Sequence, residues 1–419
     1  MGKVEFYREK EFKKTEVGEI PKEWEVRRLG EVVEKIQYGY TGSAIYQGNF
    51  KFLRITDINK EGLYINWNKV PFVFIDEKEA QDYRLSIGDV VIARIGATTG
   101  ASAIVLDDVK AIFASYLIRI KPYKNLNPLF LFYFTNSSTY WRQINQQKEG
   151  ALKKGINTKI LANISIPLPP LSEQKAIAKV LKDFDDLLEV IEEKIKTLQR
   201  IKKGLMEVYF TKGVFKHKEF KDTEIGRIPK EWEVRRLGDK CIIESGGTPN
   251  RNVKDFWNGN INWLTSEVCK NSFIYEHIVK EKITEAGLNK SNARLFPPDT
   301  VLIALVGATL GKVAYLTFES CTNQNVAGIY RCKGIFPKYL FYFLKLLNLK
   351  GFFVVKGYKV MTLKFIKNLL IPLPPLEEQK AIAERLKTID DQIENLKSQK
   401  ESLQKIKKKF MDLLLTGKV

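Results

Sequence analysis

The chain has 419 residues, which is enough for two or three domains that each bury a core. Its 69 Lys and Arg residues outnumber 49 Asp and Glu residues, and the resulting formal charge of +20 favours a polyanionic partner such as double-stranded DNA over an acidic small substrate. No stretch approaches the roughly 20 apolar residues of a membrane span, and the polar N-terminus has no signal-peptide pattern, so we expect a cytoplasmic protein without a membrane partner.

The first predicted element is a segment that the chain contains twice. KEFKKTEVGEIPKEWEVRRLG at residues 10–30 returns at 218–238 as KEFKDTEIGRIPKEWEVRRLG, with 18 of 21 positions identical. IPLPPLSEQKAIAKVL at 166–181 likewise returns at 371–386 as IPLPPLEEQKAIAERL. The chain is therefore two copies of one unit of about 200 residues, and not a short-period solenoid.

The residues between the copied segments differ strongly. After the shared RRLG, the first half continues with GYTGSAIYQGNFKF and the second with SGGTPNRNVKDFWNGNINW. Because like and unlike segments meet abruptly, we interpret the copied parts as a common frame and the divergent parts as regions with different tasks. Drift after gene duplication is the alternative.

Each half continues with a strand and a glycine-containing turn. VVIARIG at 90–96 and TVLIALVG at 300–307 have strand composition and length. The turns GATTG and GATLG lack the G-K-[ST] ending of a phosphate-binding P-loop. We expect tight turns here, and the alternative is a turn that places Thr98 and Thr99, or Thr309 and Lys312, against a nucleic-acid backbone.

Aromatic helices follow the turns. PLFLFYFTNSSTYWRQI at 128–144 and PKYLFYFLKLLNL at 337–349 space their aromatic residues as a helix does. We expect these rings to lie in the core and not to act as base-stacking platforms. Each globular half is therefore predicted to mix α and β structure.

A long helix closes each half, because the prolines stop after each PLPP. Ser172 is the predicted N-cap of the first helix, and Glu173, Glu377 and Glu378 suit the positive end of the helix dipole. Apolar residues then recur at spacings of four and three, which is a heptad pattern interrupted at Lys400. They are Ile177, Leu181, Phe184, Leu188, Ile191, Ile195 and Leu198 in the first helix, and Ile382, Leu386, Ile389, Ile393 and Leu396 in the second.

Two apolar stripes in one chain favour an internal antiparallel coiled coil, while pairing between two chains is the alternative. The predicted fold class is α+β, with two similar globular domains of mixed sheets joined by two long helices in a pseudo-twofold repeat. The predicted boundaries are 1–171 for the first globular domain, 172–213 for the first helix, 214–376 for the second domain and 377–419 for the second helix.

The four cysteines, Cys241, Cys269, Cys321 and Cys332, all lie in the second half, and none forms a C-x-x-C pair. With only two histidines in the chain, we predict buried free thiols and no metal site. The scarcity of histidine also disfavours histidine-based acid–base catalysis.

The combination of these segments resembles the specificity subunit of type I restriction–modification systems over essentially the whole chain. The resemblance rests on the repeated IPLPPL[SE]EQKAIA and IPKEWEVRRLG, the strand–turn GAT.G and the two closing helices. It implies two target-recognition domains that each read half of a split DNA sequence, with the helices setting the spacing. It also implies a non-catalytic, cofactor-free chain that docks methyltransferase (M) subunits and a restriction/translocase (R) subunit, which would bind the methyl donor and ATP.

Candidate DNA contacts are polar or basic residues that could reach phosphates or base edges from loops of the divergent regions. In the first half they are Arg54, Thr56, Asp57, Arg94, Thr98, Thr99, Lys153, Lys154, Asn157 and Lys159. In the second half they are Thr265, Ser266, Thr309, Lys312, Asn323, Gln324, Asn325, Lys356 and Lys359.

Two other functions remain possible from the sequence. A fused adenine methyltransferase would need an N/D-P-P-[YF] motif, but the nearest string, NPLF at 127–130, lacks the second proline and a cofactor loop before it. A coiled-coil scaffold without DNA specificity would bind duplex weakly and without sequence preference.

Overall fold

The computed structural model describes residues 11–58, 63–149, 155–347, 349 and 360–418. Its contacts divide the chain into two compact units. The first unit contains Met1–Glu193 with Lys397–Val419, and the second contains Lys194–Leu396. Each unit therefore includes one copy of the repeat and a part of each long helix.

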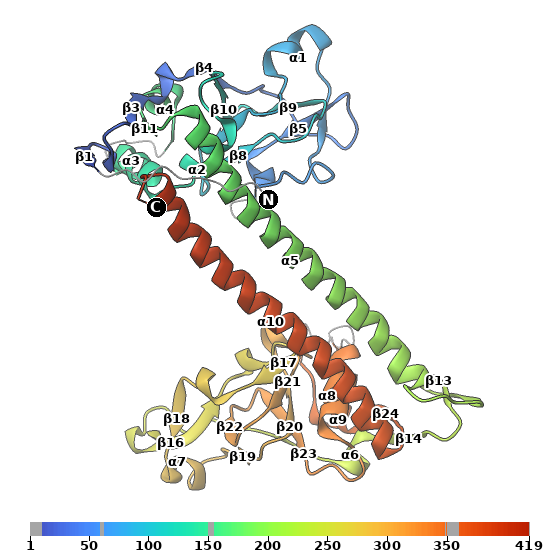
Figure 1. Cartoon of the computed structure of the whole chain (residues 1–419). Helices are drawn as coiled ribbons and strands as arrows, with labels where there is room; N and C mark the ends of the chain where they lie inside the picture. Colours follow the sequence, from blue (N-terminus) through green and yellow to red (C-terminus); the bar gives the residue numbers. More distant parts are fainter. Residues whose placement is uncertain (1–10, 59–62, 150–154, 348, 350–359, 419) are drawn as a thin grey trace. The chain divides into compact units, whose positions relative to one another are not determined.

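The elements of the first unit follow the predicted order of strands, aromatic helices and a long helix (Figure 1). Its strands are β1 (Phe12–Thr15), β2 (Gly18–Pro21), β3 (Glu25–Arg28), β4 (Val33–Tyr38), β5 (Phe50–Leu53), β6 (Phe72–Val73), β7 (Val90–Ala93), β8 (Ser102–Ile104), β9 (Ala111–Phe113), β10 (Leu117–Pro122) and β11 (Ser165–Leu168). Its helices are η1 (Leu29–Glu31), η2 (Ile55–Asp57), α1 (Glu77–Tyr83), α2 (Pro128–Phe134), α3 (Ser138–Glu149), α4 (Thr158–Ala162) and the start of α5 (Leu171–Lys212).

The second unit repeats this order with additional elements. Its strands are β12 (Phe220–Thr223), β13 (Gly226–Pro229), β14 (Glu233–Arg236), β15 (Ile242–Ser245), β16 (Trp257–Leu264), β17 (Ser272–Ile274), β18 (Glu281–Ile283), β19 (Leu295–Phe296), β20 (Thr300–Ala304), β21 (Val313–Leu316), β22 (Ser320–Thr322), β23 (Val326–Tyr330) and β24 (Leu370–Leu373). Its helices are α6 (Leu237–Lys240), η3 (Lys254–Phe256), η4 (Ser266–Val268), η5 (Glu276–Ile278), α7 (Glu285–Asn289), η6 (Gly307–Thr309), α8 (Pro337–Leu346), α9 (Leu363–Asn368) and the start of α10 (Leu376–Leu414).

The two units share one sheet topology. The order β4-β10-β7-β8 in the first unit corresponds to β15-β23-β20-β21 in the second, where β17 adds a parallel edge strand. A second sheet contains β6-β5-β9 in the first unit and β18-β16-β22-β19 in the second. Its central pairs, β5 with β9 and β16 with β22, are parallel, whereas their other neighbours are antiparallel. The prediction of mixed sheets is thereby confirmed.

The aromatic helices form the core of each unit, as predicted. Tyr133 and Phe134 in α2 and Tyr339 and Tyr342 in α8 are completely buried. The segment predicted as one helix at 128–144 is in fact two, because α2 ends before Thr135. The Thr135 hydroxyl donates to the Phe132 carbonyl, and such bonds from side chain to backbone compete with the helical pattern.

The long helices pair in antiparallel fashion within each unit. In the first unit the Phe184 and Phe410 rings lie 5.9 Å apart, and Lys400 Nζ donates to Glu192 at 2.9 Å, so α5 and α10 advance in opposite directions. The predicted stripe residues are buried or half-buried. Pairing within the chain is therefore the arrangement of these helices, and Lys400 is an ion-pair partner in the seam. The predicted N-cap was wrong, since α5 begins at Leu171 and Ser172 lies in its first turn.

The cysteine prediction was half wrong. Cys241 and Cys332 form a disulfide, while Cys269 and Cys321 are buried free thiols whose pKa burial raises to about 12 in both cases. The antiparallel register that places Ile242 opposite Tyr330 brings the two bonded cysteines together. Because 91 residues separate them, only this strand register could reveal the pair.

Candidate nucleic-acid interface

The copied residues form a buried network of polar contacts within each unit, which we call its frame. Trp24 Nε1 donates to Glu173 Oε2 at 3.1 Å, and Trp232 Nε1 donates to Glu378 Oε2 at 3.0 Å. The two carboxylates are buried, so their role exceeds the helix-dipole role expected from the sequence. Each bond fixes the start of a long helix to the IPKEW segment of its own unit.

The glutamine that follows each of these carboxylates makes a second fastening. Gln174 Oε1 accepts from the Asn127 backbone N–H, and its amide donates to the Pro169 carbonyl. Gln379 does the same with the Phe336 N–H and the Pro374 carbonyl. The shared EQ dipeptide therefore ties each long helix to the aromatic helix of its unit, which explains why both copies contain it.

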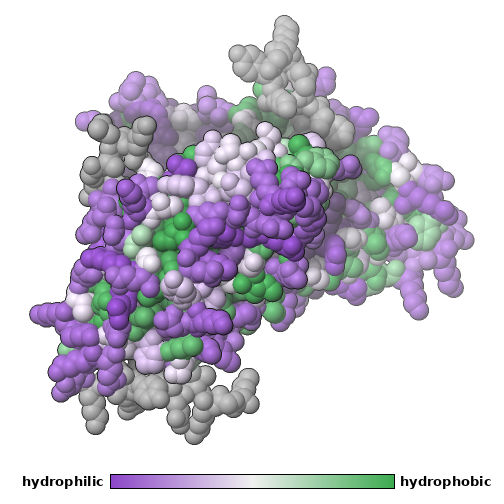
Figure 2. All heavy atoms as spheres, turned by 90° about the horizontal axis from the view of Figure 1, so that it is seen from above, coloured by the Kyte–Doolittle hydropathy of each residue, from purple (hydrophilic) through white to green (hydrophobic). Residues whose placement is uncertain are grey.

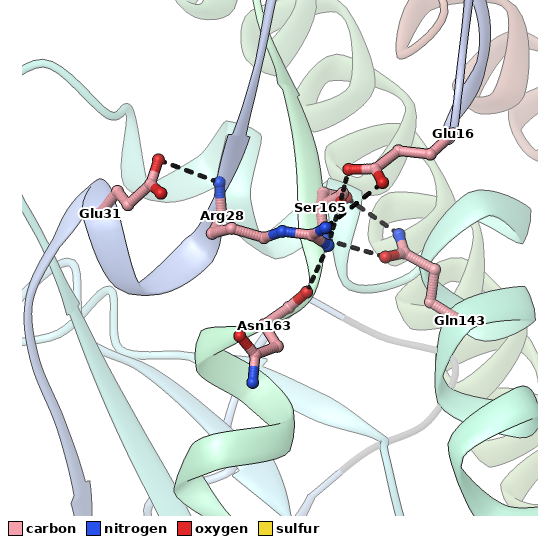
Figure 3. A network of polar contacts seen from close by, with 6 residues as sticks. All are labelled: Glu16, Arg28, Glu31, Gln143, Asn163 and Ser165. Carbon is pink, nitrogen blue, oxygen red and sulfur yellow. Dashed lines mark hydrogen bonds and ion pairs between the residues drawn. The ribbon is translucent and has the colours of Figure 1, made fainter.

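A polar network around Arg28 closes the frame of the first unit (Figure 3). The Arg28 guanidinium donates to the Asn163 carbonyl at 2.9 Å and to the Ser165 hydroxyl at 2.5 Å. Glu16 and Gln143 also bind Ser165, through its hydroxyl and its backbone respectively. The network joins β3 to β11, so the copied RRLG segment supports the divergent region without belonging to it.

On this frame, the divergent loops of each unit meet where several strands end. Five backbone hydrogen bonds hold these strand ends together, and they recur at corresponding positions of the two units. The pairs of N–H and carbonyl residues are Gly39–Leu117 and Gly246–Val326, Tyr40–Phe113 and Gly247–Thr322, Ala114–Leu53 and Asn323–Leu264, Arg94–Tyr116 and Leu305–Asn325, and Ile156–Arg94 and Met361–Leu305. We call these two places the strand-end clusters of the first and second unit.

Close backbone contact requires glycine in both clusters. A Cβ atom on Gly39 would lie 2.3 Å from the Ala114 carbonyl oxygen, and one on Gly246 would lie 2.2 Å from the Thr322 carbonyl oxygen. The two frames therefore present different side chains from nearly the same backbone.

In the first cluster, Arg94 occupies a preorganised position. Its guanidinium lies 4.6 Å from the centroid of the Tyr38 ring, and Nη1 donates to the Ser115 carbonyl at 3.4 Å. Its buried Nε has no hydrogen-bond acceptor in the described part of the chain. A buried donor without an acceptor is uncommon in native proteins and suits an external acceptor such as a phosphate or a base edge.

Other predicted residues of the first unit lie in or beside this cluster but have intramolecular tasks. Arg54 at the end of β5 binds the Asp57 carboxylate through Nε and Nη2, each at 3.0 Å, so part of its donor capacity is used. Asn157 caps α4 by accepting from the Ile160 N–H. Thr56 and Lys159 are exposed, whereas Lys153 and Lys154 lie outside the described residues.

The second cluster collects predicted amide and hydroxyl side chains. Gln324 is exposed, and its Oε1 accepts from the Thr248 hydroxyl at 2.5 Å, while Asn323 Oδ1 accepts from the Asn325 N–H. Thr265 and Ser266 follow β16 at the position that Arg54 and Ile55 occupy after β5. Lys356 and Lys359 fall outside the described residues.

The glycine turns are tight turns, as expected. Gly96, Gly100, Gly307 and Gly311 all have positive φ, between 73° and 97°. Thr99 is buried and its hydroxyl donates to the Gly96 carbonyl inside the turn, while Thr98, Thr309 and Lys312 are half-buried. Contact of these residues with a nucleic-acid backbone stays a prediction.

Sequence reasoning missed the aromatic and arginine side chains beside the clusters. Tyr38 and Tyr116 are exposed at the first cluster, and Arg251 is exposed on the segment that leads from the second. These residues stand in the divergent stretches of the sequence. The hydrophobic pattern there has no periodicity from which their exposure could be predicted.

The face drawn in Figure 2 is mostly hydrophilic, with scattered hydrophobic patches. Among the described residues, no group of three or more His, Cys, Asp or Glu side chains could hold a metal ion. Over the same residues, no helix is long and apolar enough to cross a membrane.

Comparisons with known proteins agree with the repeat. Residues 21–200 and 229–405 match the family described as the type I restriction modification DNA specificity domain. A Methanocaldococcus jannaschii chain named as the MjaX specificity subunit of a type I restriction enzyme is 36% identical, over 99% of this chain and 98% of that relative. The MjaVIII specificity subunit of the same organism is 32% identical, over 99% and 97%.

A likeness in fold accompanies the likeness in sequence. One solved structure is described as the structural basis of complex assembly and conformational transition of the type I R-M system. A chain of that structure aligns with this chain with a TM-score of 0.60. The alignment covers 96% of this chain and 99% of that chain at 21% identity, so it shows a shared fold.

Proposed function

Because this chain belongs to the family of type I restriction–modification DNA specificity subunits, we propose that its two units each read one half of a split, asymmetric DNA site. The observation that carries the proposal is the pair of strand-end clusters. They share five backbone hydrogen bonds but present different side chains, with Arg94 and Tyr38 in one and Gln324 and Thr248 in the other. Two similar frames with different reading residues suit a bipartite, non-palindromic target.

The chemistry of binding divides into two tasks. The net charge of +20 supplies attraction to phosphates, which positions the duplex but does not read its sequence. The arginine, amide and hydroxyl groups of the strand-end clusters have the donors and acceptors needed at base edges. Specificity then resides in the divergent loops, and the copied frame fixes where those loops stand.

The partners follow from the family. We infer that the chain acts without its own catalytic centre or cofactor, with M subunits that transfer the methyl group and an R subunit that uses ATP. The copied segments, which are alike in both units, suit docking of like M subunits. A cytoplasmic location follows from such partners and from a DNA substrate.

The decisive experiment uses this chain co-expressed with its M subunit. The purified complex would methylate a random duplex library, and sequencing would map the methylated adenines. We expect a motif of two fixed blocks with an unspecified gap. Replacing residues 31–165 with the corresponding part of another specificity subunit should change one block and leave the other unchanged.

Two results would oppose the proposal. Methylation without a split motif would contradict one half-site per unit. Absence of methylation, together with duplex binding that is indifferent to sequence, would assign the repeat to a protein scaffold. The salt dependence of binding should be steep for the proposed function, because each neutralised phosphate releases counterions.

A further inference from the structure

The second unit holds one exposed arginine in an unusually fixed position. The Arg251 guanidinium lies 4.1 Å from the centroid of the Trp257 ring and 5.0 Å from that of the Trp263 ring. Its Nη1 and Nη2 atoms donate to the two carboxylate oxygens of Glu281, Nη2 at 3.2 Å. The side chain nevertheless remains 52% exposed. Aromatic and carboxylate contacts therefore orient a cation that solvent still reaches.

Hydrogen bonds also fix the backbone segment that leads to Arg251. Trp263 Nε1 donates to the Gly247 carbonyl at 3.0 Å, and Trp257 Nε1 donates to the Asn250 carbonyl at 3.2 Å. A Cβ atom at Gly247 would lie 2.1 Å from the Asn292 carbonyl oxygen, so this position also requires glycine. The segment from Gly247 to Arg251 is thus held along its length by side chains of β16.

This segment starts in the second strand-end cluster. Gly247 takes part in one of the five shared backbone bonds, and the next residue, Thr248, binds Gln324. The first unit has GYTGSAIYQG in the corresponding stretch and has no arginine there. Arg251 therefore belongs to the part of the second unit that distinguishes it from the first.

The contacts leave one edge of the guanidinium for a ligand. Glu281 takes the edge formed by Nη1 and Nη2, and no described residue accepts from Nε. The Nε–H and the second Nη2–H form a parallel pair of donors, and guanine offers a matching pair of acceptors, N7 and O6, in the major groove. Adenine presents a donor beside N7 and does not match.

We propose that Arg251 determines specificity for a guanine in the DNA half-site read by the second unit. The Trp257 and Trp263 rings hold the guanidinium in place, and Glu281 occupies its Nη1/Nη2 edge, which leaves Nε–H and the second Nη2–H for the base. This inference rests on the proposed DNA-reading function and names the base that one residue of the second unit selects. Preorganisation reduces the ordering cost of the contact on binding.

The test compares methylation motifs of complexes that contain the M subunit and either the original chain or Arg251→Lys or Arg251→Ala. The original complex should require guanine at one position of the block read by the second unit. Both variants should relax that position, with a roughly 5- to 150-fold loss of discrimination against other bases, and should leave the other block unchanged. Lysine retains the charge but not the two parallel donors.

Two further variants separate reading from loop support. Glu281→Gln weakens one contact that orients the guanidinium but keeps the arginine, so the guanine requirement should relax less than in Arg251→Lys. Arg331→Asn is the matched control, because Arg331 is also exposed and lies 5.9 Å from a ring centroid, that of Tyr330. Arg331 follows the C-terminal end of β23, whereas the strand-end cluster lies at the N-terminal end of that strand. Its φ is 48°, a backbone conformation that asparagine tolerates.

The outcomes are distinguishable. An unchanged motif with uniformly weaker binding in Arg251→Lys and Arg251→Ala would show that Arg251 contacts a phosphate, which would overturn the proposal. Equal relaxation of the guanine position by Glu281→Gln and Arg251→Lys would also overturn it, because Arg251 would then only support the loop. Melting temperatures of all variants would identify a variant that loses specificity because it unfolds. If Arg251→Ala is such a variant, the motif of Arg251→Lys decides the test. If the original complex shows no split motif, the proposed function itself fails.

Discussion

At the scale of single residues, the copied positions are explained by buried polar contacts. Glu173 and Glu378 are equivalent in the repeat and both accept from a tryptophan, but their other partners differ. Glu378 Oε1 also accepts from the Val214 and Phe215 N–H groups and lies 2.9 Å from His217 Nε2. A similar sequence therefore places similar carboxylates in unequal environments.

This inequality predicts opposite responses to the same substitution. Burial raises the pKa of Glu173, only partly offset by the Trp24 bond, so its charged form is disfavoured in the folded state. Stability from this group is therefore greatest below the unfolded pKa and falls as pH rises through the raised folded pKa. Glu173→Gln should remove that loss and leave the free energy of unfolding at pH 7 equal to or above that of the original chain.

Glu378→Gln serves as the matched comparison. Its amide cannot accept from Trp232 and from the two backbone N–H groups together, so we expect a loss of about 1–3 kcal/mol. Urea unfolding of both variants between pH 4 and 8 would measure this. A Glu173→Gln variant that is less stable than Glu378→Gln at pH 7 would contradict the assignment.

At the scale of elements, a triad of an aspartate, a tyrosine and a lysine joins each helix pair to its unit. Asp185 accepts from the Tyr133 hydroxyl at 2.8 Å and from Lys407 Nζ at 2.6 Å. Asp390 accepts correspondingly from Tyr342 at 3.0 Å and Lys202 at 2.5 Å. Burial and the adjacent carboxylate raise the pKa of both tyrosines, which keeps their hydroxyls as donors. Lys202 and Lys407 thus connect α5 with α10.

The two triads should differ in strength. The Asp185 side chain is only 4% exposed, whereas Asp390 is 25% exposed and has Lys345 Nζ at 3.8 Å as a further cation. Lys407→Met leaves a buried carboxylate with one donor and should cost about 3–5 kcal/mol. Lys202→Met should cost less.

Urea denaturation would compare the two variants. Adding Asp185→Asn to Lys407→Met should recover part of the loss, because the unpaired charge is then removed. Equal losses in Lys407→Met and Lys202→Met, or no recovery in the double variant, would show that pairing with Asp185 is not the source of the effect.

At the scale of the whole molecule, duplication gives one chain two reading units and two antiparallel helix stretches. The same residue types return about 205 positions apart in both triads, so each unit receives the start of one long helix and the end of the other. Because each unit contains a part of both long helices, a change in helix length affects both units. We propose that helix length sets the gap between the half-sites.

A matched deletion tests the proposal about the gap. Removing residues 192–198 and 397–403 takes one heptad from each helix, which keeps the apolar seam in register and removes the Glu192–Lys400 pair together. Seven residues correspond to about 10 Å of helix, or roughly three base pairs. Methylation mapping should show both blocks unchanged and a shorter gap, whereas replacing the same heptads by others of equal length should leave the gap unchanged.

The repeat, the α+β class, the strands at 90–96 and 300–307, the buried aromatic helices and the antiparallel coiled coil followed from the sequence alone, because hydrophobic periodicity and proline positions are local signals. The tertiary structure decided what depends on residues far apart in the chain. It paired Cys241 with Cys332 through a strand register, turned Glu173 from a helix-end charge into a buried acceptor for Trp24, joined Lys407 to Asp185, and set Arg251 against two tryptophans. Such contacts join residues brought together only by chain reversal, and no local pattern encodes which of them will meet.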